Sequence, residues 1–248
     1  MKAMSAGISN IRSKWMEKNF WNYKILAYLT LGVYILIVGK KRIKNIKITL
    51  TSLALIFVFI TVGARIVWYI SSRKPIEYLF ALKFAYFKIS GAIIGGFLAI
   101  FILTKIFKKE KRVIVDTCTE AMFLCGCVAK IECFMGGCCL GKIIAPQYKN
   151  IYSILGIHNF YPVQLYESFI LFITFILLRV LKDKVKDSTR ISVAVVFYIL
   201  VRMFILEGLY MHGNFMGNER IRIIYFFIIL ICVATILYDF FKKSHIKC

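Results

Sequence analysis

Long apolar stretches, separated by short connectors rich in lysine, run through the whole chain. Each stretch consists mainly of Leu, Ile, Phe and Val and is close to the roughly 20 residues that a helix needs to cross a bilayer. This pattern predicts an all-α polytopic membrane protein with about seven transmembrane helices. The predicted spans are approximately residues 24–39, 48–70, 84–104, 113–131, 161–179, 191–210 and 222–240. Because no internal repeat or long linker divides the sequence, we expect one integral-membrane domain over residues 1–248.

Lysine and arginine are concentrated in every second connector, and this sets the expected orientation. Basic connectors stay on the cytoplasmic side of a membrane, so the pattern fits an odd number of crossings with the N-terminus outside and the C-terminus in the cytoplasm. The basic lead before residue 24 counts against this orientation, and we interpret it as an interfacial amphipathic helix rather than a removable signal peptide. The basic connectors contain Lys40, Lys41, Arg42, Lys44 and Lys47, then Lys105, Lys108, Lys109, Lys111 and Arg112, then Arg179, Lys182, Lys184, Lys186 and Arg190.

Composition supports a membrane setting and narrows the range of partners. The chain is 60% hydrophobic, carries a formal net charge of +22 at pH 7 and has a mean hydropathy of +0.75. Such a charge is also typical of proteins that bind nucleic acid, but here the basic residues are spread over the loops of a polytopic chain. We therefore expect contacts with membrane lipids through their anionic head groups, and no nucleic acid.

Polar residues at membrane depth mark the candidate site, because each is costly there unless it is paired or hydrated. By the predicted orientation most of them lie towards the outer face, where we expect a single polar cavity. They are Arg65, Ser90, the segment 116–142, the segment 161–168, and the pair Arg202 and Glu207. Arg65 alternatively reaches the outer interface as an ordinary snorkelling residue.

Short motifs follow one another in order from residue 63 to residue 210. They read GAR at 63–65, ISGAIIG at 89–95, AKIECFMGGCCLG at 129–141, YPVQLYE at 161–167 and EGLY at 207–210, with Asp116 fourteen positions before Lys130. Taken together, these motifs resemble the prolipoprotein diacylglyceryl transferase family. The resemblance implies that the protein moves a diacylglyceryl group from phosphatidylglycerol to the cysteine thiol of a prolipoprotein signal peptide. It also implies that the protein lies in the bacterial cytoplasmic membrane and acts at its outer face.

The resemblance further implies roles for individual residues of these motifs. The implied catalytic residues are Ser90, Lys130, Arg202 and Glu207. The implied substrate-binding residues are Arg65, Gly91, Lys130, Cys133, Cys138, Gly141, Gln164, Tyr166 and Glu167. We expect no cofactor and no metal ligand among them.

Several of these positions depart from the family pattern. Ser90 stands where the family has the histidine proposed as its base, and Lys130 stands where it has an arginine. Lys130 keeps the positive charge but loses the paired hydrogen bonds of a guanidinium. Arg202 and Glu207 are five residues apart instead of four, which places them about 140° apart around an α-helix unless the helix bulges. The retained PVQLYE and EGL strings favour a transferase, whereas the missing histidine favours a degenerate paralogue that binds anionic lipid or, through its cysteines, a metal.

Six cysteines lie between residues 118 and 139. Cys118, Cys125 and Cys127 are expected to be small buried residues at helix contacts. Cys133 and Cys138 belong to the glycine-rich stretch 132–142, which we expect to form a re-entrant cradle at the outer face. A disulfide between Cys133 and Cys138 and a metal site remain open as alternatives.

Overall fold

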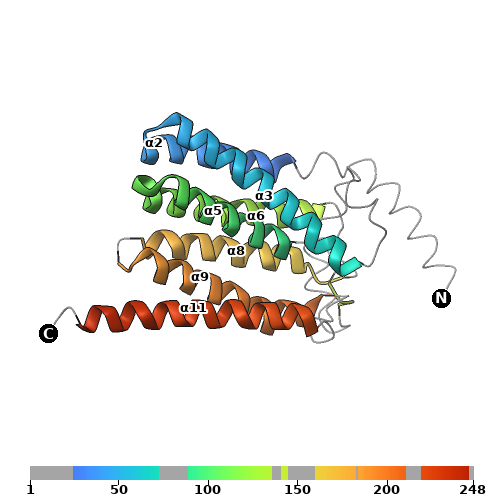
Figure 1. Cartoon of the computed structure of the whole chain (residues 1–248). Helices are drawn as coiled ribbons and strands as arrows, with labels where there is room; N and C mark the ends of the chain where they lie inside the picture. The colour runs from blue at the N-terminus through green and yellow to red at the C-terminus, as the bar shows by residue number, and fades with distance from the viewer. Residues whose placement is uncertain are drawn as a thin grey trace. The chain divides into compact units, whose positions relative to one another are not determined.

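The structure, a computed structural model, describes residues 25–72, 89–135, 141–144, 160–182, 184–210 and 219–245. These residues form helices and short connections with two isolated β-bridges, which confirms the all-α prediction (Figure 1). The first helix covers residues 25–34 and continues through η1 (Ile35–Gly39), a π turn, into α2 (Lys40–Ile43). The elements that follow are α3 (Ile46–Ser72), α5 (Ile89–Ile106), η2 (Lys108–Glu110), α6 (Lys111–Met135), α8 (Val163–Val180), α9 (Asp187–Val201), η4 (Arg202–Leu206), α10 (Glu207–Leu209) and α11 (Glu219–His245).

Three of the described helices are long and apolar enough to cross a membrane, namely Ile46–Ile70, Val163–Val180 and Asp187–Leu206. A fourth crossing is counted when Gly91–Ile106 and Lys108–Met135, which meet at a bend of 120°, are taken together as one broken span. Apolar helices of this length agree with a membrane protein. The number of seven crossings and the orientation of the termini stay predictions.

The chain forms two compact units, residues 1–137 (unit 1) and residues 138–248 (unit 2). Unit 1 contains the first helix, α3, α5 and α6, and unit 2 contains α8, α9 and α11. The candidate site residues are divided between the units, because Arg65 to Cys133 belong to unit 1 and Gly141 to Glu207 belong to unit 2. That residues 1–248 act as one domain stays a prediction.

In unit 1, α3 and α5 cross in direct backbone contact at glycines. A Cβ atom on Gly63 would overlap the carbonyl oxygen of Gly91, and a Cβ atom on Gly95 would overlap the carbonyl oxygen of Phe59. Glycine therefore allows an approach that no other residue permits. Because the crossing lies near the end of α3 and the start of α5, it fixes the end of α3 that carries Arg65.

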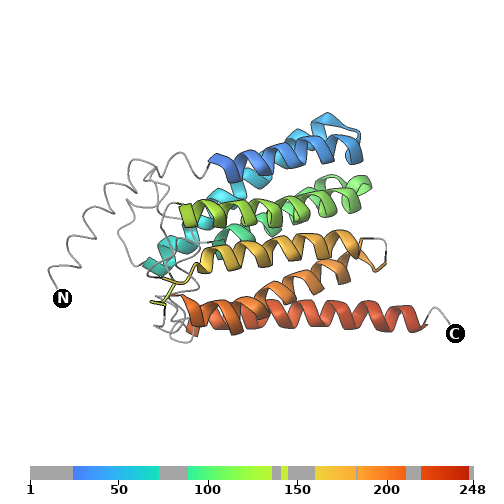
Figure 2. The same ribbon diagram turned by 180° about the vertical axis from the view of Figure 1, so that it is seen from behind.

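Apolar side chains from all four helices fill the interior of unit 1. Leu31, Ile56, Leu103 and Ile114 come from the first helix, α3, α5 and α6, and each is fully buried. Seen from behind, the first helix lies along unit 1 beside these helices (Figure 2). The thiols of Cys118, Cys125 and Cys127 are also buried, in agreement with the expectation that they are helix-packing residues.

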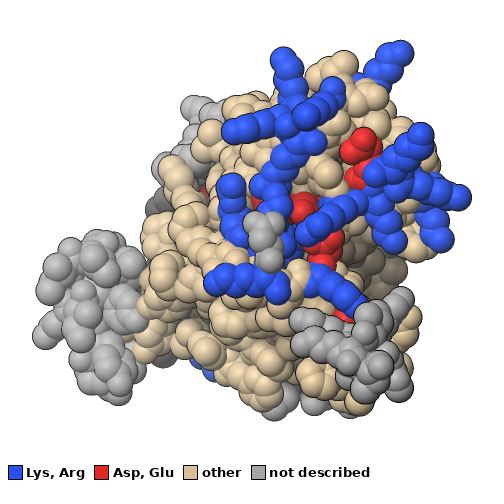
Figure 3. Space-filling model, turned by 90° about the vertical axis from the view of Figure 1, so that its left-hand side faces the viewer, with Lys and Arg blue, Asp and Glu red and all other residues tan. Residues whose placement is uncertain are grey.

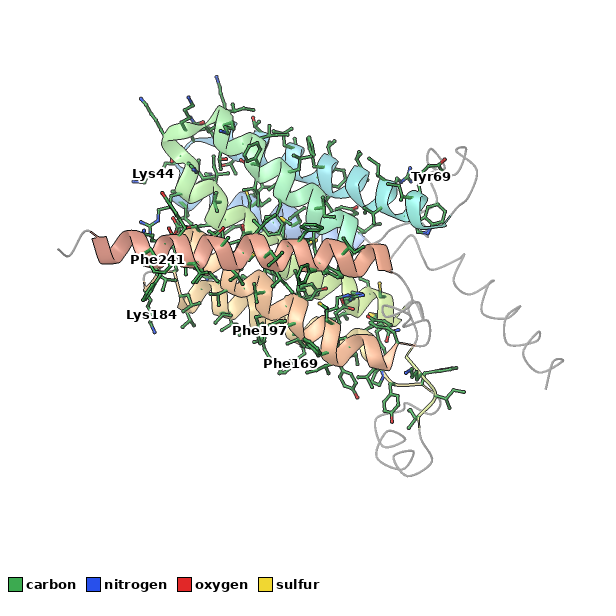
Figure 4. All side chains as sticks on the ribbon, turned by 60° about the horizontal axis from the view of Figure 1, so that its bottom comes forward. Lys44, Tyr69, Phe169, Lys184, Phe197 and Phe241 are labelled. Carbon is green, nitrogen blue, oxygen red and sulfur yellow. The ribbon has the colours of Figure 1, made fainter. Side chains whose placement is uncertain are left out.

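The connectors of unit 1 bring its basic residues to one end. Lys44 lies at this end and Tyr69 at the other (Figure 4). Seen from the basic end, many lysine and arginine side chains, drawn in blue, cover the surface (Figure 3). Below this surface, Glu120 is 1% exposed and pairs with Arg42, whose Nη1 lies 3.1 Å from Oε2. The hydroxyl of Tyr34 also donates to Oε2. A basic partner from α2 thus neutralises a buried acid of α6.

In unit 2, side chains tie the start of α9 to its neighbours. Arg190 is 1% exposed, and its guanidinium lies 3.5 Å from the carbonyl oxygen of Leu178 on α8 and 3.6 Å from the carboxylate of Asp187. On α11, the carboxylate of Asp239 accepts hydrogen bonds from Ser188 and from Thr189, the latter at 2.8 Å. These contacts fix α8, α9 and α11 at the end of unit 2 that carries the 181–186 connector.

A π turn, η4, interrupts the helix that begins as α9. The turn covers Arg202–Leu206 and leads directly into α10. In a π turn the backbone bonds residue i to residue i+5, so one residue more is accommodated than in an α-helical turn. Backbone positions 202 and 207 therefore lie above one another, and the 140° separation of a regular α-helix does not apply. The side chain of Glu207 is outside the described residues.

Candidate functional site

The polar centre of unit 2 is the carboxylate of Glu167 on α8, which is fully buried. The hydroxyl of Tyr198 on α9 donates to Oε1 at 2.8 Å, and the guanidinium of Arg202 in η4 pairs with the same oxygen. The hydroxyl of Tyr210, directly after α10, donates to Oε2. One carboxylate thus joins three elements, and donors of this kind stabilise its ionised form.

Arg202 is held in one orientation by this arrangement. Its guanidinium lies over the ring of Tyr210, 5.5 Å from the ring centroid, and its side chain is 16% exposed. The pair with Glu167 engages Nη1, and a guanidinium has further N–H donors in the same plane. Arg202 is therefore a fixed and partly accessible cation with an anchored rear edge, a geometry suited to an anionic ligand.

The last glycine of the glycine-rich stretch joins the unit 2 site through its backbone. Gly141 forms a β-bridge with Tyr210, and the adjacent amide of Lys142 donates to the carbonyl oxygen of Leu209 at 2.7 Å. The amide of Tyr161 donates to the carbonyl oxygen of Lys142 at 3.0 Å. A Cβ atom on Gly141 would overlap the carbonyl oxygen of Tyr161, so only glycine fits between these strands of chain.

The first turns of α8 supply the other predicted residues of unit 2. Gln164 is 2% exposed, and it is three residues before Glu167, so the two lie on one face of the helix. Tyr166 is half-buried and packs against the apolar cluster that Leu206 and Tyr210 help to form. The structure thus brings Gln164 and Tyr166 close to the carboxylate that holds Arg202.

The predicted residues of unit 1 gather at the end opposite its basic connectors. Arg65 lies near the end of α3, Ser90 and Gly91 lie at the start of α5, and Lys130 and Cys133 lie near the end of α6. Gly91 and Lys130 are buried, whereas Arg65 and Cys133 are half-buried. Antiparallel packing of α3, α5 and α6 explains why residues so far apart in sequence share one end.

Polar contacts run from the first helix into this end of unit 1. The hydroxyl of Tyr28 lies 3.1 Å from the hydroxyl of Thr61 on α3. Tyr28 also interacts electrostatically with Arg65 on α3 and with Cys125 on α6. Tyr28 therefore links the first helix to both α3 and α6 in the part of unit 1 that carries Arg65.

Glu132 is a second acid in this end of unit 1, and it is 3% exposed. The backbone amide of Ala27 donates to its Oε1 at 3.2 Å. Glu132 interacts electrostatically with Cys125, which is two helical turns earlier on the same face of α6. A buried carboxylate is thus the first residue of the glycine-rich stretch, two residues after Lys130.

Some predicted site groups fall outside the described residues. They are Cys138 and its neighbour Cys139, together with the side chains of Ser90 and Glu207. The disulfide between Cys133 and Cys138 stays a hypothesis for this reason. Within the residues that the structure covers, no three His, Cys, Asp or Glu side chains are placed to hold a metal ion.

Comparison with known proteins identifies the family. Residues 21–240 match the family described as prolipoprotein diacylglyceryl transferase. The chain belongs to this family. It is also similar to the phosphatidylglycerol–prolipoprotein diacylglyceryl transferase of Clostridium tetani (strain Massachusetts / E88), with 29% identity over 168 residues. This match covers 64% of the chain and 66% of the relative, so it spans slightly less than two thirds of each protein.

Three buried residues of the candidate site in this prolipoprotein diacylglyceryl transferase family member were not predicted from the sequence. Tyr198 and Tyr210 both bind Glu167, but tyrosines in apolar spans are common enough to be read as interfacial residues. The available signal for Tyr198 was its place four residues before Arg202, on the same helical face. For Glu132 the signal was an acid directly after the predicted span 113–131, two residues from Lys130.

Proposed function

We propose that this chain transfers the diacylglyceryl group of phosphatidylglycerol to the cysteine thiol of a prolipoprotein signal peptide, at the outer face of the bacterial cytoplasmic membrane. A C–S bond forms between the thiol sulfur and the glyceryl carbon that carries the phosphate. The C–O bond from that carbon to the phosphate breaks, and glycerol phosphate leaves with the electron pair of that bond. The proton of the thiol passes to a base. Family membership and the paired Arg202 support this proposal.

Arg202 has the chemistry to bind the phosphate of the lipid. A guanidinium gives two parallel hydrogen bonds to a phosphate, and its charge offsets the charge that develops on the departing group. The family resemblance also assigns Lys130 and Gly91 of unit 1 and Gly141 of unit 2 to substrate binding, and each glycine is required for close packing within its own unit. Gln164 is a hydrogen-bond partner for the glycerol hydroxyls.

The observation that carries the proposal is the ion pair between Glu167 and Arg202. Tyr198 and Tyr210 donate hydrogen bonds to the same carboxylate, so the guanidinium is oriented before any lipid binds. Preoriented donors stabilise a developing charge without reorganising during the reaction. An ion pair with a purely structural role can be completely buried, whereas the side chain of Arg202 is 16% exposed.

The experiment that tests the proposal combines purified protein, labelled phosphatidylglycerol and a peptide with a lipoprotein signal-peptide cysteine. A thioether-linked diacylglyceryl peptide is the expected product, detected by mass spectrometry. Arg202→Lys keeps the charge but loses the planar fork, and we expect at least about a tenfold lower rate from it. Absence of product from the wild-type protein, while a histidine-containing family member works under the same conditions, contradicts the proposal.

The alternative function is that of a paralogue that binds anionic lipid without transferring it. The serine at position 90 favours this reading, because a serine hydroxyl on its own does not accept a proton at neutral pH. Binding of phosphatidylglycerol without any thioether product is the result that this alternative expects. Stoichiometric zinc or copper that is lost in Cys133→Ser and Cys138→Ser would indicate the metal-binding form of the alternative.

A further inference from the structure

Glu132 occupies a place on α6 that helix stability does not explain. It lies in the last turn of a helix that ends at Met135, where the helix macrodipole disfavours an anion. It is also 3% exposed, so most of its hydration is lost. Burial of a carboxylate in such a place is costly unless specific contacts or a function maintain it.

The surroundings of Glu132 are those of the predicted substrate site of unit 1. Cys125, two helical turns earlier on the same face of α6, interacts with it electrostatically. Tyr28 on the first helix interacts electrostatically with Cys125 and with Arg65 on α3. Lys130 is two residues earlier on α6 and lies on the opposite face of the helix. Glu132 is also the first residue of the glycine-rich stretch 132–142, and α6 ends within that stretch at Met135.

Glu132 has the chemistry that position 90 lacks. A carboxylate accepts a proton directly, and enzymes use buried Glu side chains as general bases. Ala27 donates its backbone amide to Oε1, which orients the carboxylate.

We propose that Glu132 is the general base of the transfer reaction, an inference that rests on the proposed function. Glu132 removes the proton from the thiol of the incoming signal-peptide cysteine. The resulting thiolate attacks the glyceryl carbon, the C–S bond forms, and glycerol phosphate departs with the electrons of the C–O bond. The proton on Glu132 then passes to the departing phosphate or to water, which restores the carboxylate.

The test is the pH dependence of the rate of Glu132→Gln in the full-length protein. The amide still accepts the hydrogen bond from Ala27 but no longer takes a proton, so structure and basicity are separated. At pH 7 we expect at least a hundredfold lower rate, because general-base catalysis contributes roughly 10²–10⁴-fold. The residual rate rises about tenfold per pH unit up to the ordinary thiol pKa of about 8.5, because only free thiolate then reacts. Binding of phosphatidylglycerol to vesicle-reconstituted protein stays within about threefold of wild type.

The matched control is Glu120→Gln, which removes another buried acid from the same helix at the opposite end of unit 1. It breaks the pair with Arg42, so we expect lower thermal stability with a wild-type pH profile. A wild-type rate and pH profile in Glu132→Gln, measured with an active wild-type enzyme, overturns the inference and leaves the proposed function standing. A wild-type protein that forms no thioether overturns the proposed function and the inference with it.

Discussion

Glu167 and Glu132 are both buried carboxylates, but their surroundings differ. Glu167 receives hydroxyl donors from Tyr198 and Tyr210 and pairs with Arg202, which stabilises its ionised form. Glu132 is held by a backbone amide beside a thiol, in the last turn of α6. The first arrangement fixes a cation in place. The second places a proton acceptor near the cysteines at the end of α6. The two acids therefore belong to different steps of the proposed reaction.

The contacts of Glu167 predict graded effects on stability. Glu167→Gln leaves the guanidinium of Arg202, which is 16% exposed, without its counter-charge. We expect a loss of about 3 kcal/mol, the low end for a broken buried pair, because the guanidinium keeps part of its hydration. Tyr198→Phe removes one hydrogen bond to a charged group, with an expected loss of about 1.5–3 kcal/mol. Unfolding in detergent, followed by circular dichroism, measures both. The control is Tyr238→Phe on α11, where the side chain is 64% exposed. Equal effects in all three variants would contradict the assignment of Glu167 as the centre of the site.

Part of the site followed from the motifs, and part followed only from packing. Gln164 and Glu167 lie on one helix face by their spacing alone. The pair of Glu167 with Arg202 required only that the few polar residues of two apolar helices face each other. Tyr198 and Glu132 could not be chosen, because a sequence does not show which of many tyrosines and acids face inward. Their roles depend on helix rotation, which packing decides.

At the scale of elements, the closest contact is the crossing of α3 and α5. Gly95→Ala places a methyl group into the carbonyl oxygen of Phe59, so the helices must separate. We expect destabilisation of about 1–3 kcal/mol from this overpacking. In Gly32→Ala the new Cβ atom meets no heavy atom within 4 Å. The greater helix propensity of alanine then predicts a gain of up to about 1 kcal/mol. Thermal unfolding of both variants measures the difference, and a similar loss in both would contradict the crossing.

The π turn η4 predicts an unusual tolerance of a deletion. Removing Phe204, which is 79% exposed, takes out the additional residue and allows an ordinary α-helical turn. We expect this variant to fold and to keep the pair between Arg202 and Glu167. Removing Leu200 instead rotates Arg202 by about 100° relative to Tyr198 and breaks the pair. Expression level and phosphatidylglycerol binding distinguish the two deletions. Loss of both properties in the Phe204 deletion would show that the bulge itself is required.

The pattern of apolar residues predicted the elements better than their ends. The predicted span 113–131 lies inside α6, which extends to Lys111 and Met135 because helical backbone continues into polar sequence beyond an apolar core. The π turns η1 and η4 could not be seen, since hydrophobic periodicity does not resolve one inserted residue. The spacing of Arg202 and Glu207 was the single indication of η4.

At the scale of the whole molecule, the charge of the connectors predicts the topology. An alkaline phosphatase fused after residue 150 is expected to be active, because this reporter folds only outside the cytoplasm and the predicted topology places residue 150 at the outer face. Fusions after residue 184 and after residue 248 are expected to be inactive, because basic connectors stay inside. Enzyme assays on intact cells check all three. Activity in the fusion after residue 248 would reverse the predicted orientation and move the site to the cytoplasmic face.

The β-bridge between Gly141 and Tyr210 connects the glycine-rich stretch to the ion pair of Glu167 and Arg202. Gly141 is the last glycine of that stretch, Tyr210 lies opposite it, and the hydroxyl of Tyr210 donates to Glu167. Any side chain at position 141 would push the backbone away from Tyr161. This displacement would reach Glu167 through Tyr210 and would change the position of the guanidinium without touching it.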